Sequence, residues 1–380
     1  MQLYDDFFEY LDTHRYCLLF CNADRNFGTL YDAFRFHEEF FPMYRTTLYV
    51  IGGITDVFLV LTVFILLRYG RDLSKSYRNI MVFNTLLPAL FTNHICFLWQ
   101  PYAIAPHFVV FTVGPIRWSS YSTVALIMIF VCLSIQITYS LFSQLSYHAF
   151  IILSPSNTLK MFWINLTWNT IAFCAIVFNM IFMFLAIERK HDRLEAKLLA
   201  DDPRCEYIIA NYAPYVVDVN TATIPMNVLI LEAIYAFFIF GLGIVYFTIR
   251  ILRSFLKNRS LFSERVTRVQ KNIIRTLFAY TATYFGLLGF PTTGASAAML
   301  LGLAAEHLPL AALYFTCTSI TAIIFCVINL FTVSPYRRAI RSFLTRCMPA
   351  LIGSANSSTA SVSQNRNAAD SLFTRQPQPE

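Results

Sequence analysis

Charged residues are scarce in this chain: Asp, Glu, Lys and Arg make up 13% of its 380 residues, whereas a typical soluble domain carries about 25%. The motifs of common enzyme classes are also missing. The sequence has no H-E-x-x-H, no G-x-S-x-G, no glycine-rich phosphate loop and no Cys/His cluster with metal-binding spacing. We therefore expect no enzymatic activity, no cofactor and no bound metal.

Apolar residues take the place of charge, at 57% of the chain and a mean hydropathy of +0.54. They gather in seven stretches. Crossing the hydrocarbon core of a bilayer takes about 20 such residues in a helix. Each stretch reaches that length, so the sequence predicts an all-α membrane protein, a bundle of seven transmembrane helices. The predicted spans are 48–67, 80–99, 119–141, 161–187, 225–252, 276–303 and 308–333.

Basic residues at the ends of the spans predict the orientation. Ten Lys and Arg lie in the N-terminal tail and the second–third and fourth–fifth connections, and nineteen lie on the other side. An excess of Lys and Arg marks the cytoplasmic side, so we expect a plasma-membrane protein with its N-terminus outside. Residues 1–16 are acidic and lack the pattern of a signal peptide. Because the net charge of +7 is spread along span ends, we expect no nucleic-acid partner.

Composition divides the chain into four parts. Apolar residues near the C-terminus recur at spacings of three and four, with arginines mostly on the other side. Such a segment is typical of a short eighth helix that lies on the inner membrane surface and binds membrane lipids. The predicted parts are an extracellular tail at 1–45, the bundle at 46–334, the amphipathic helix at 335–349 and a disordered cytoplasmic tail at 350–380.

The connection between the fourth and fifth spans is the longest. Residues 188–200 are good helix formers without a breaker, so we expect the fourth helix to project beyond the bilayer until Pro203 ends it. The following stretch, 207–223, is rich in Tyr, Asn and Val. We expect it to fold over the helix ends as a lid.

The cysteines outside the spans suggest two modifications. Cys17, Cys21 and Cys205 face the oxidising exterior in the predicted orientation. A disulfide from Cys17 or Cys21 to Cys205 would join the tail to the long loop, and the connectivity stays open. Cys347 lies beside the membrane on the cytosolic side, which makes it a palmitoylation candidate.

Polar side chains inside the spans are where a ligand site is expected, because an acidic residue at the centre of a membrane helix costs about 2.5–3.5 kcal/mol on insertion scales. Several lie in the outer or middle parts of the second, third, fifth, sixth and seventh spans, where they are predicted to line an outward-facing cavity for a small molecule. These ligand-binding candidates are Glu232, Asn93, His94, Tyr121, Tyr284 and Tyr314.

Structural interpretations compete with the functional ones. A hydrogen bond from Asp56 to Asn84 that only positions helices is favoured over ligand contact. For Glu232, ligand contact and structural pairing are equally supported. On the inner side, a polar network that includes Asn329 is expected to switch between packed states.

The fifth–sixth connection is short and strongly basic. Retention of this loop in the cytosol explains part of the charge, and a docking surface for an acidic partner would explain the rest. The predicted partner-coupling residues in this connection are Arg253, Lys257, Arg268 and Lys271.

Several short motifs make the chain resemble a known family. They are Ser-Lys-Ser-Tyr-Arg-Asn at 74–79 with Asn84, Leu-Trp-Gln-Pro-Tyr-Ala-Ile-Ala-Pro at 98–106 with Gly114, and Pro-Tyr-Arg at 335–337. With seven helices, a basic third inner loop and an eighth helix, the chain resembles a G-protein-coupled receptor, and within that class the nematode serpentine chemoreceptors of class H. The resemblance covers about 41–348.

The resemblance implies a chemosensory receptor that binds a small molecule outside and signals to a heterotrimeric G protein inside, with a sensory cilium as a suitable location. It adds Pro335, Tyr336 and Arg337 to the coupling surface. The acid-Arg-aromatic motif that ends the third helix of rhodopsin-like receptors is absent at 142–148. The alternative function is a seven-helix transporter or ligand-gated channel, although no internal repeat supports a transporter.

Overall fold

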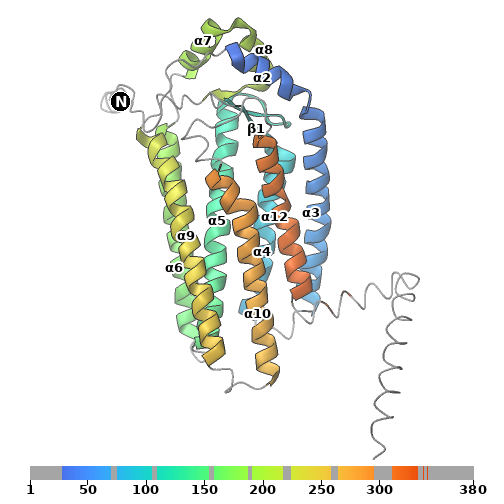
Figure 1. Ribbon diagram of the computed structural model, residues 1–380, viewed down its shortest axis with the longest axis vertical. Coiled ribbons are helices and arrows are strands. Elements are labelled where there is room, and N and C mark those ends of the chain that lie inside the picture. Colours follow the sequence, from blue (N-terminus) through green and yellow to red (C-terminus); the bar gives the residue numbers. More distant parts are fainter. Residues whose placement is uncertain are drawn as a thin grey trace, which may run out of the picture.

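Long helices that run side by side form the body of the protein (Figure 1). The structure, a computed structural model, describes most of the chain between residues 28 and 340. The described residues are 28–69, 75–104, 109–153, 158–186, 191–216, 224–257, 264–294 and 310–332, with residues 337 and 340.

Seven long helical segments make up the bundle within the described part of the chain. Two of them are α-helices that continue into a wider π turn. The segments are α3 (Phe41–Tyr69), α4 (Lys75–Asn93) with η1 (His94–Trp99), α5 (Ser120–Leu153), α6 (Thr158–Ala186), α9 (Ile224–Lys257), α10 (Glu264–Thr283) with η5 (Tyr284–Gly289), and α12 (Leu310–Thr332). This arrangement agrees with the predicted seven-helix bundle.

The surface of the bundle is apolar, as a lipid solvent requires. Large apolar side chains such as Val57, Val60, Phe173 and Leu242 are more than half exposed. Five helical segments among the described residues are long and apolar enough to cross a membrane. They are Phe41–Arg68, Arg78–Trp99, Ser120–Ser146, Leu166–Leu185 and Ala311–Phe331.

Two helices extend further than their apolar stretches. The third span was expected to end at 141, but α5 continues to Leu153, and α10 begins at Glu264 rather than at 276. These extensions carry polar and charged residues, which end an apolar stretch without ending a helix. A hydropathy profile measures the lipid-embedded length, whereas the backbone hydrogen bonds continue beyond it.

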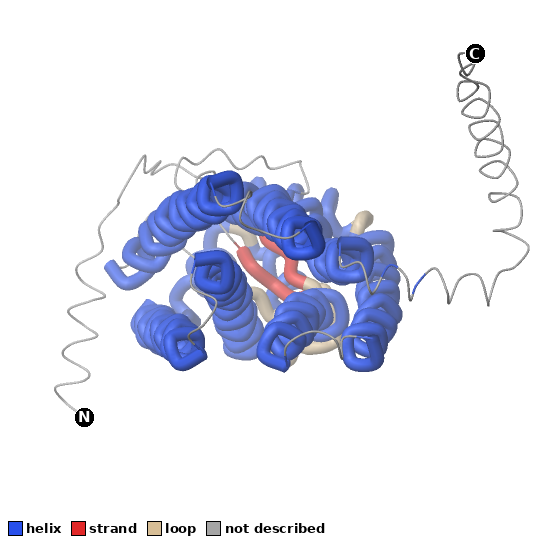
Figure 2. Tube along the Cα trace, turned by 90° about the horizontal axis from the view of Figure 1, so that it is seen from below, coloured by secondary structure: helices blue, strands red, loops and turns tan. Residues whose placement is uncertain are grey.

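A folded layer closes one end of the bundle; we call it the cap, and that end the capped end (Figure 1). Its strands form one antiparallel sheet in the order β1-β2-β3. Seen from the opposite end in Figure 2, the strands lie across the bundle within the outline of the helices. The cap comprises α2 (Gly28–Glu38), β1 (Pro101–Ile104), β2 (Val109–Thr112), α7 (His191–Asp201), η2 (Pro203–Cys205), α8 (Glu206–Tyr212) and β3 (Tyr215–Val216).

The cap corrects one prediction and confirms part of another. The fourth span does not project as a continuous helix, because α6 ends at Ala186 and α7 is a separate helix that lies in the cap. Residues 191–200 satisfy helix propensity locally, but burial of Leu194 and Leu198 against the cap sets their direction. The predicted lid at 207–223 is confirmed for 207–216, which form α8 and β3.

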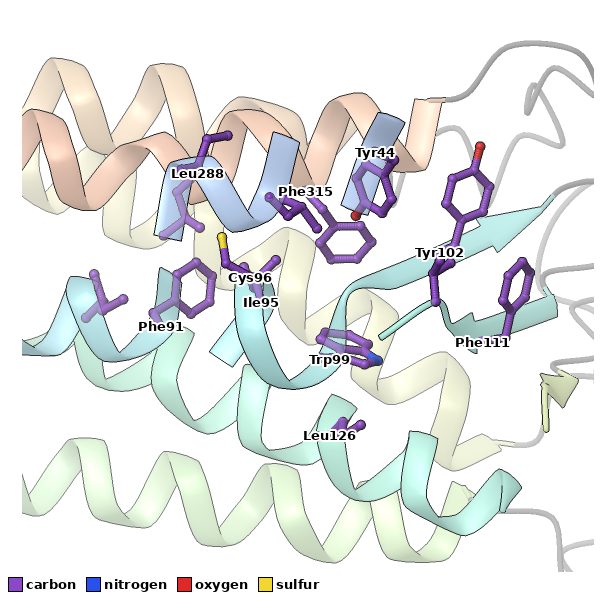
Figure 3. Packing of buried hydrophobic residues seen from close by; sticks show 14 of the residues in the cluster. Tyr44, Phe91, Ile95, Cys96, Trp99, Tyr102, Phe111, Leu126, Leu288 and Phe315 are labelled. Atoms are coloured by element: carbon purple, nitrogen blue, oxygen red, sulfur yellow. The ribbon is translucent and has the colours of Figure 1, made fainter. Parts of the chain in front are cut away.

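The sheet has two different faces because side chains alternate along a strand. Tyr102 of β1 lies opposite Phe111 of β2, and the two rings lie on one face of the sheet, where Phe111 packs against Phe34 of α2 and Tyr102 against Phe41 at the start of α3. Thr112, next to Phe111, therefore points to the other face, toward the bundle. Figure 3 shows Tyr102 and Phe111 on the hairpin, with Trp99 beneath the point where the hairpin leaves η1.

Candidate ligand site

A cluster of aromatic rings fills the bundle below the cap. Trp99 of η1 packs against Phe130 of α5 and Phe315 of α12, with ring centroids 5.4 and 5.5 Å apart. Phe91 of α4 lies 5.0 Å from Phe130, and Tyr314 lies 4.8 Å from Phe315. Four elements thus supply one apolar wall, which is the usual lining of a small-molecule site.

The π turn η1 brings its side chains into this cluster. Its wider backbone ring is closed by the Gln100 N–H, which donates to the carbonyl of Ile95 over 2.8 Å. Pro101 follows and disfavours a helical conformation at Gln100, which adopts φ 46° instead. A left-handed residue other than glycine costs about 1–3 kcal/mol and persists only where the surroundings hold it.

Three hydrogen bonds hold Gln100 in that conformation. Besides the bond to Ile95, its carbonyl accepts from the Val113 N–H at 3.0 Å and its side-chain Nε2 donates to Cys96 at 2.8 Å. Gly114 allows the close approach, since a Cβ there would lie 2.8 Å from the carbonyl oxygen of Trp99. The end of η1 is therefore fixed to the cap.

His94 lies at the start of η1 and is buried. Its Nε2 donates to the carbonyl oxygen of Leu126 on α5 over 2.9 Å, and its ring lies 5.7 Å from that of Trp99. The Nδ1 of His94 and the Nε1 of Trp99 are both buried without a protein hydrogen-bond partner. Two polar atoms with unused hydrogen-bonding capacity thus lie beside the aromatic cluster.

Asn93 and Asp56 form a polar pair between α4 and α3. The Nδ2 of Asn93 donates to Asp56 Oδ1 over 2.7 Å. The expected bond between Asp56 and Asn84 is therefore wrong: Asn84 donates to Gln144 of α5 over 2.8 Å. Residues 84 and 93 lie nine positions apart on one helix and therefore differ in depth by about 14 Å. The predicted bounds of the spans do not show which of these two depths lies beside Asp56.

The two tyrosine candidates of the last spans each bind a threonine. The hydroxyl of Tyr284 lies 2.9 Å from Thr138 Oγ1 on α5, and that of Tyr314 lies 3.1 Å from Thr292 Oγ1. Tyr284 begins the π turn η5, which precedes Pro291. Because proline has no N–H and crowds the preceding turn, a wider turn before it relieves the backbone.

The predicted ligand-binding residues lie in different surroundings. His94, Tyr284 and Tyr314 all belong to elements that pack around the aromatic cluster. Tyr121, at the start of α5, is 61% exposed. Glu232 lies on α9, but its side chain is outside the described residues.

The cap above the cluster is closed by interlocked rings. Phe34 is fully buried and lies 5.3–5.8 Å from Phe41, Phe111 and Tyr212. The hydroxyl of Tyr102 forms a 2.7 Å hydrogen bond with His37 Nδ1. Burial raises the pKa of Tyr102, so its phenol stays protonated at neutral pH.

Hydrogen bonds and ion pairs of carboxylates connect the elements on the outer surface of the cap. Glu38 accepts from the hydroxyls of Tyr207 at 2.7 Å and Tyr212 at 3.1 Å. Burial, followed by the charge of Glu38, raises the pKa of Tyr212 to about 12. Hydrogen bonds from Arg204 lower the pKa of Asp202, and Arg204 reaches on to Asp32 over 2.9 Å.

Cys205 is buried inside the cap and forms no disulfide with another described residue, and burial raises the pKa of its thiol to about 12. The predicted partners Cys17 and Cys21 are outside the described residues, as is the palmitoylation candidate Cys347. The disulfide and the lipid modification stay predictions.

A polar network joins four helices in the half of the bundle away from the cap. Tyr280 of α10 donates to Asn329 Oδ1 of α12. Asn329 Nδ2 in turn donates to Thr85 Oγ1 of α4 over 2.9 Å, and the neighbouring Asn84 bonds to Gln144 of α5. We call these five residues the inner network. Asn329 was expected to take part in such a network, and its partners Tyr280 and Thr85 were not identified from the sequence.

The predicted coupling residues lie at the uncapped end as far as the structure describes them. Arg253, Lys257, Lys271 and Arg337 are exposed. The side chain of Arg268 and all of Pro335 and Tyr336 are outside the described residues. Of the predicted eighth helix, residues 337 and 340 are described as helical, and Ile340 packs against an apolar cluster that includes Leu66 and Met81.

Sequence reasoning missed the aromatic wall and the threonine partners. Trp99, Phe130 and Phe315 are apolar residues within apolar spans, so nothing in the local pattern separates them from lipid-facing rings. Trp99 did carry one signal, its place directly before Gln-Pro at the end of a span. No group of His, Cys, Asp or Glu among the described residues is placed to hold a metal ion.

Comparison with known proteins identifies a family. A family model described as "Serpentine type 7TM GPCR chemoreceptor Srh" matches residues 41–346, which is more than half of the chain. Among curated proteins, no significant match is found. The matched region runs from the first residue of α3 past the end of α12.

Proposed function

This chain belongs to the Srh family of serpentine seven-transmembrane chemoreceptors, and we propose that it binds a small molecule in the capped half of the bundle and signals to a heterotrimeric G protein. One observation carries the proposal for the site. An aromatic wall built by four elements lies beside buried polar atoms without protein partners, in the part of the bundle next to the folded cap. A receptor of this kind is not an enzyme and uses no cofactor.

We place the capped end outside the cell and the basic, uncapped end in the cytosol. The support is the distribution of ten and nineteen basic residues on the two sides. The receptor then lies in the plasma membrane, with a sensory cilium as its proposed location, and contacts membrane lipids around the bundle. An epitope at residue 1 should bind antibody on intact cells, and an epitope at residue 380 only after permeabilisation. The reverse labelling would contradict this orientation.

The proposed ligand contacts extend the aromatic wall. His94, Tyr284 and Tyr314 are retained because their elements pack around the cluster, and Asn93 because it is half-buried next to His94. Glu232 and Tyr121 are retained from the sequence. For Glu232, the variant Glu232→Gln should weaken the response to an agonist while surface expression stays normal. Unchanged response and expression would remove it from the site.

Signal transfer requires a two-state element that both ligand and partner sense. We propose α10 as that element, because η5 and Pro291 interrupt its regular backbone near the ligand site. Its other end lies next to the basic coupling surface. Tyr280 places the inner network between the two.

The test of coupling neutralises four basic residues of this surface. The variant with Arg253, Lys257, Arg268 and Lys271 all changed to Gln should lose G-protein output and keep ligand binding. A matched control changes Arg35, Arg117 and Lys197 to Gln, which are near the cap and so leave the basic excess of the uncapped end intact. Epitope labelling must show the same orientation in all variants. Full output from the correctly oriented quadruple variant would mean that this loop serves only orientation.

A transporter or ligand-gated channel makes the opposite prediction in a direct comparison. Cells that express the chain should respond to an active compound with a second messenger in the presence of a G protein. Current or substrate uptake that persists without any G protein would favour the alternative class.

A further inference from the structure

We infer that the ligand is a small uncharged molecule with a hydroxyl group, and that His94 and Trp99 recognise this hydroxyl. The inference rests on the proposed function, which supplies a small-molecule site. It goes further by naming the chemistry of the ligand. His94 and Trp99 support this inference. Each ring is held in place by a hydrogen bond or by packing contacts, and each keeps one polar atom that no protein group satisfies.

His94 presents an acceptor to the site. Its Nε2 lies 2.9 Å from the carbonyl oxygen of Leu126, and a carbonyl can only accept, so Nε2 carries the proton. In a neutral imidazole the other nitrogen is then an unprotonated acceptor. That Nδ1 is buried, and no protein group donates to it.

Trp99 presents a donor. The indole N–H can only donate, and it is buried without a protein acceptor. The ring itself is fixed on several sides by His94, Phe130 and Phe315. In Figure 3 the nitrogen of Trp99 lies on the side of the ring toward the hairpin. The donor is therefore held in place before any ligand arrives.

A hydroxyl is a small uncharged group that satisfies both atoms, because it donates one hydrogen bond and accepts others. The two rings are neighbours at 5.7 Å between centroids, so one small molecule can contact both. A ketone or ether satisfies only Trp99, and a hydrocarbon satisfies neither. A charged group would be buried among rings without a paired ion, which is costly.

The surroundings also orient the ligand. On the cap side, Gln100 Oε1 and Thr112 Oγ1 are buried without protein partners, and Thr112 points from the sheet toward the bundle by strand alternation. On the deeper side, Phe130 continues to Phe91. The polar end of the molecule thus lies toward the cap and its apolar body toward α4 and α5.

The test observes Trp99 directly in the full chain reconstituted in lipid nanodiscs. The four tryptophans are labelled with ¹⁵N in the indole, and the Trp99 signal is identified by its loss in Trp99→Phe. Three probes of similar size are titrated: benzyl alcohol, which donates and accepts, acetophenone, which only accepts, and ethylbenzene, which does neither. Benzyl alcohol should shift the Trp99 signal at the lowest concentration, and ethylbenzene should bind about tenfold more weakly or not at all.

Two variants separate the roles of the two residues. His94→Leu removes the Nδ1 acceptor and offers no replacement for it, so it should weaken benzyl alcohol about tenfold and leave acetophenone unchanged. Trp168→Phe is the matched control, since the Trp168 indole already donates to Ser146 over 2.9 Å. That control should leave the order of the three probes unchanged.

Two results would overturn the inference. One is a Trp99 signal that ignores all three probes, as expected if water alone bonds to these atoms. The other is equal binding of benzyl alcohol and ethylbenzene. Signalling is read separately on the same probes: binding at Trp99 without G-protein output would count against the proposed function but not against the hydroxyl site.

Discussion

The two halves of the bundle treat their buried polar groups differently. Near the cap, His94, Trp99, Gln100 and Thr112 each keep a buried polar atom that no protein group satisfies. In the other half, the inner network joins α4, α10 and α12 through hydrogen bonds between side chains, and the unsatisfied atoms there, such as Gln144 Nε2 and Thr281 Oγ1, are not gathered beside an aromatic cluster. In an apolar solvent an unmade hydrogen bond is costly. What sets the capped half apart is that its unsatisfied atoms gather beside one aromatic cluster, an arrangement that suits a ligand site.

The largest effect is expected in the cap that separates the ligand half from the outside. Phe34→Ala removes a fully buried ring with four aromatic neighbours and should destabilise the cap by about 3–5 kcal/mol. Phe36→Ala, two residues away on the same helix, is the control because Phe36 is 44% exposed.

The buried thiol of Cys205 reports on this opening. With any disulfide to Cys205 reduced beforehand, the folded cap holds it as an unreactive thiol at pH 8, because burial raises its pKa to about 12, while the opened cap releases an ordinary cysteine. A water-soluble maleimide should label Cys205 faster in Phe34→Ala than in Phe36→Ala. Equal labelling rates would mean that the ring cluster does not hold the cap closed.

The second effect addresses the inner network. Asn329→Ala removes the acceptor of Tyr280 and the donor to Thr85, which leaves buried groups unpaired at about 1–3 kcal/mol. We expect a lower melting temperature together with altered basal G-protein output, because α10 loses its link to α12. Tyr246→Ala is a surface control, as Tyr246 is 58% exposed. A lower melting temperature with unchanged basal output would reduce the network to a structural role.

The third effect compares adjacent glycines on α3, below the cap. A Cβ on Gly52 would lie 2.6 Å from Phe97 Cζ of η1, whereas a Cβ on Gly53 meets nothing within 4 Å. Gly52→Ala should therefore destabilise by about 1–3 kcal/mol through overpacking. Gly53→Ala should stabilise by about 0.5–1 kcal/mol, as alanine does inside a helix. Thermal melting of the two variants should move in opposite directions, and a shared direction would contradict the close packing of α3 on η1.

The smallest effect concerns the ion pairs of the cap. Arg204 lowers the pKa of Asp202 from its ordinary value of 3.8. The stabilisation is present above that value and is lost as pH falls through the lower pKa of the folded state. Because the Arg204 side chain is half exposed, solvent screens most of the attraction. Arg204→Gln should slightly speed hydrogen exchange of η2 and α8 at pH 7, with no difference from the wild type at the acid end of the titration. A difference in exchange rate between variant and wild type that grows as the pH falls would contradict the lowered pKa of Asp202.

The sequence predicted the capped and uncapped halves unequally well. Hydropathy placed all seven helices, because a lipid solvent imposes one length and one composition on each. It could not show that α5 continues to Leu153, since polar residues beyond the bilayer carry no such constraint. Apart from the lid at 207–216, the cap was not predicted for a related reason: its order comes from contacts between distant segments, such as Tyr207 with Glu38.

Site residues were predictable where polarity marked them. His94 and Tyr284 stand out as polar residues in apolar spans, and the structure places both on elements that pack around one aromatic cluster. Their partners could not be read in the same way. The bond of Asp56 to Asn93 rather than Asn84 depends on how α3 and α4 align along their length, and the direction of Trp99 depends on a π turn that sequence periodicity does not reveal.

We expect a molecule bound in the capped half to change the state of a G protein at the uncapped end. Vesicles that contain only this chain and a heterotrimeric G protein can test it, with nucleotide exchange and ion flux measured together while a panel of small volatile compounds is added from the capped side. We predict that an active compound raises nucleotide exchange without ion flux, and that the quadruple variant of the basic surface loses this response. Compound-dependent ion flux with no change in nucleotide exchange would contradict the account.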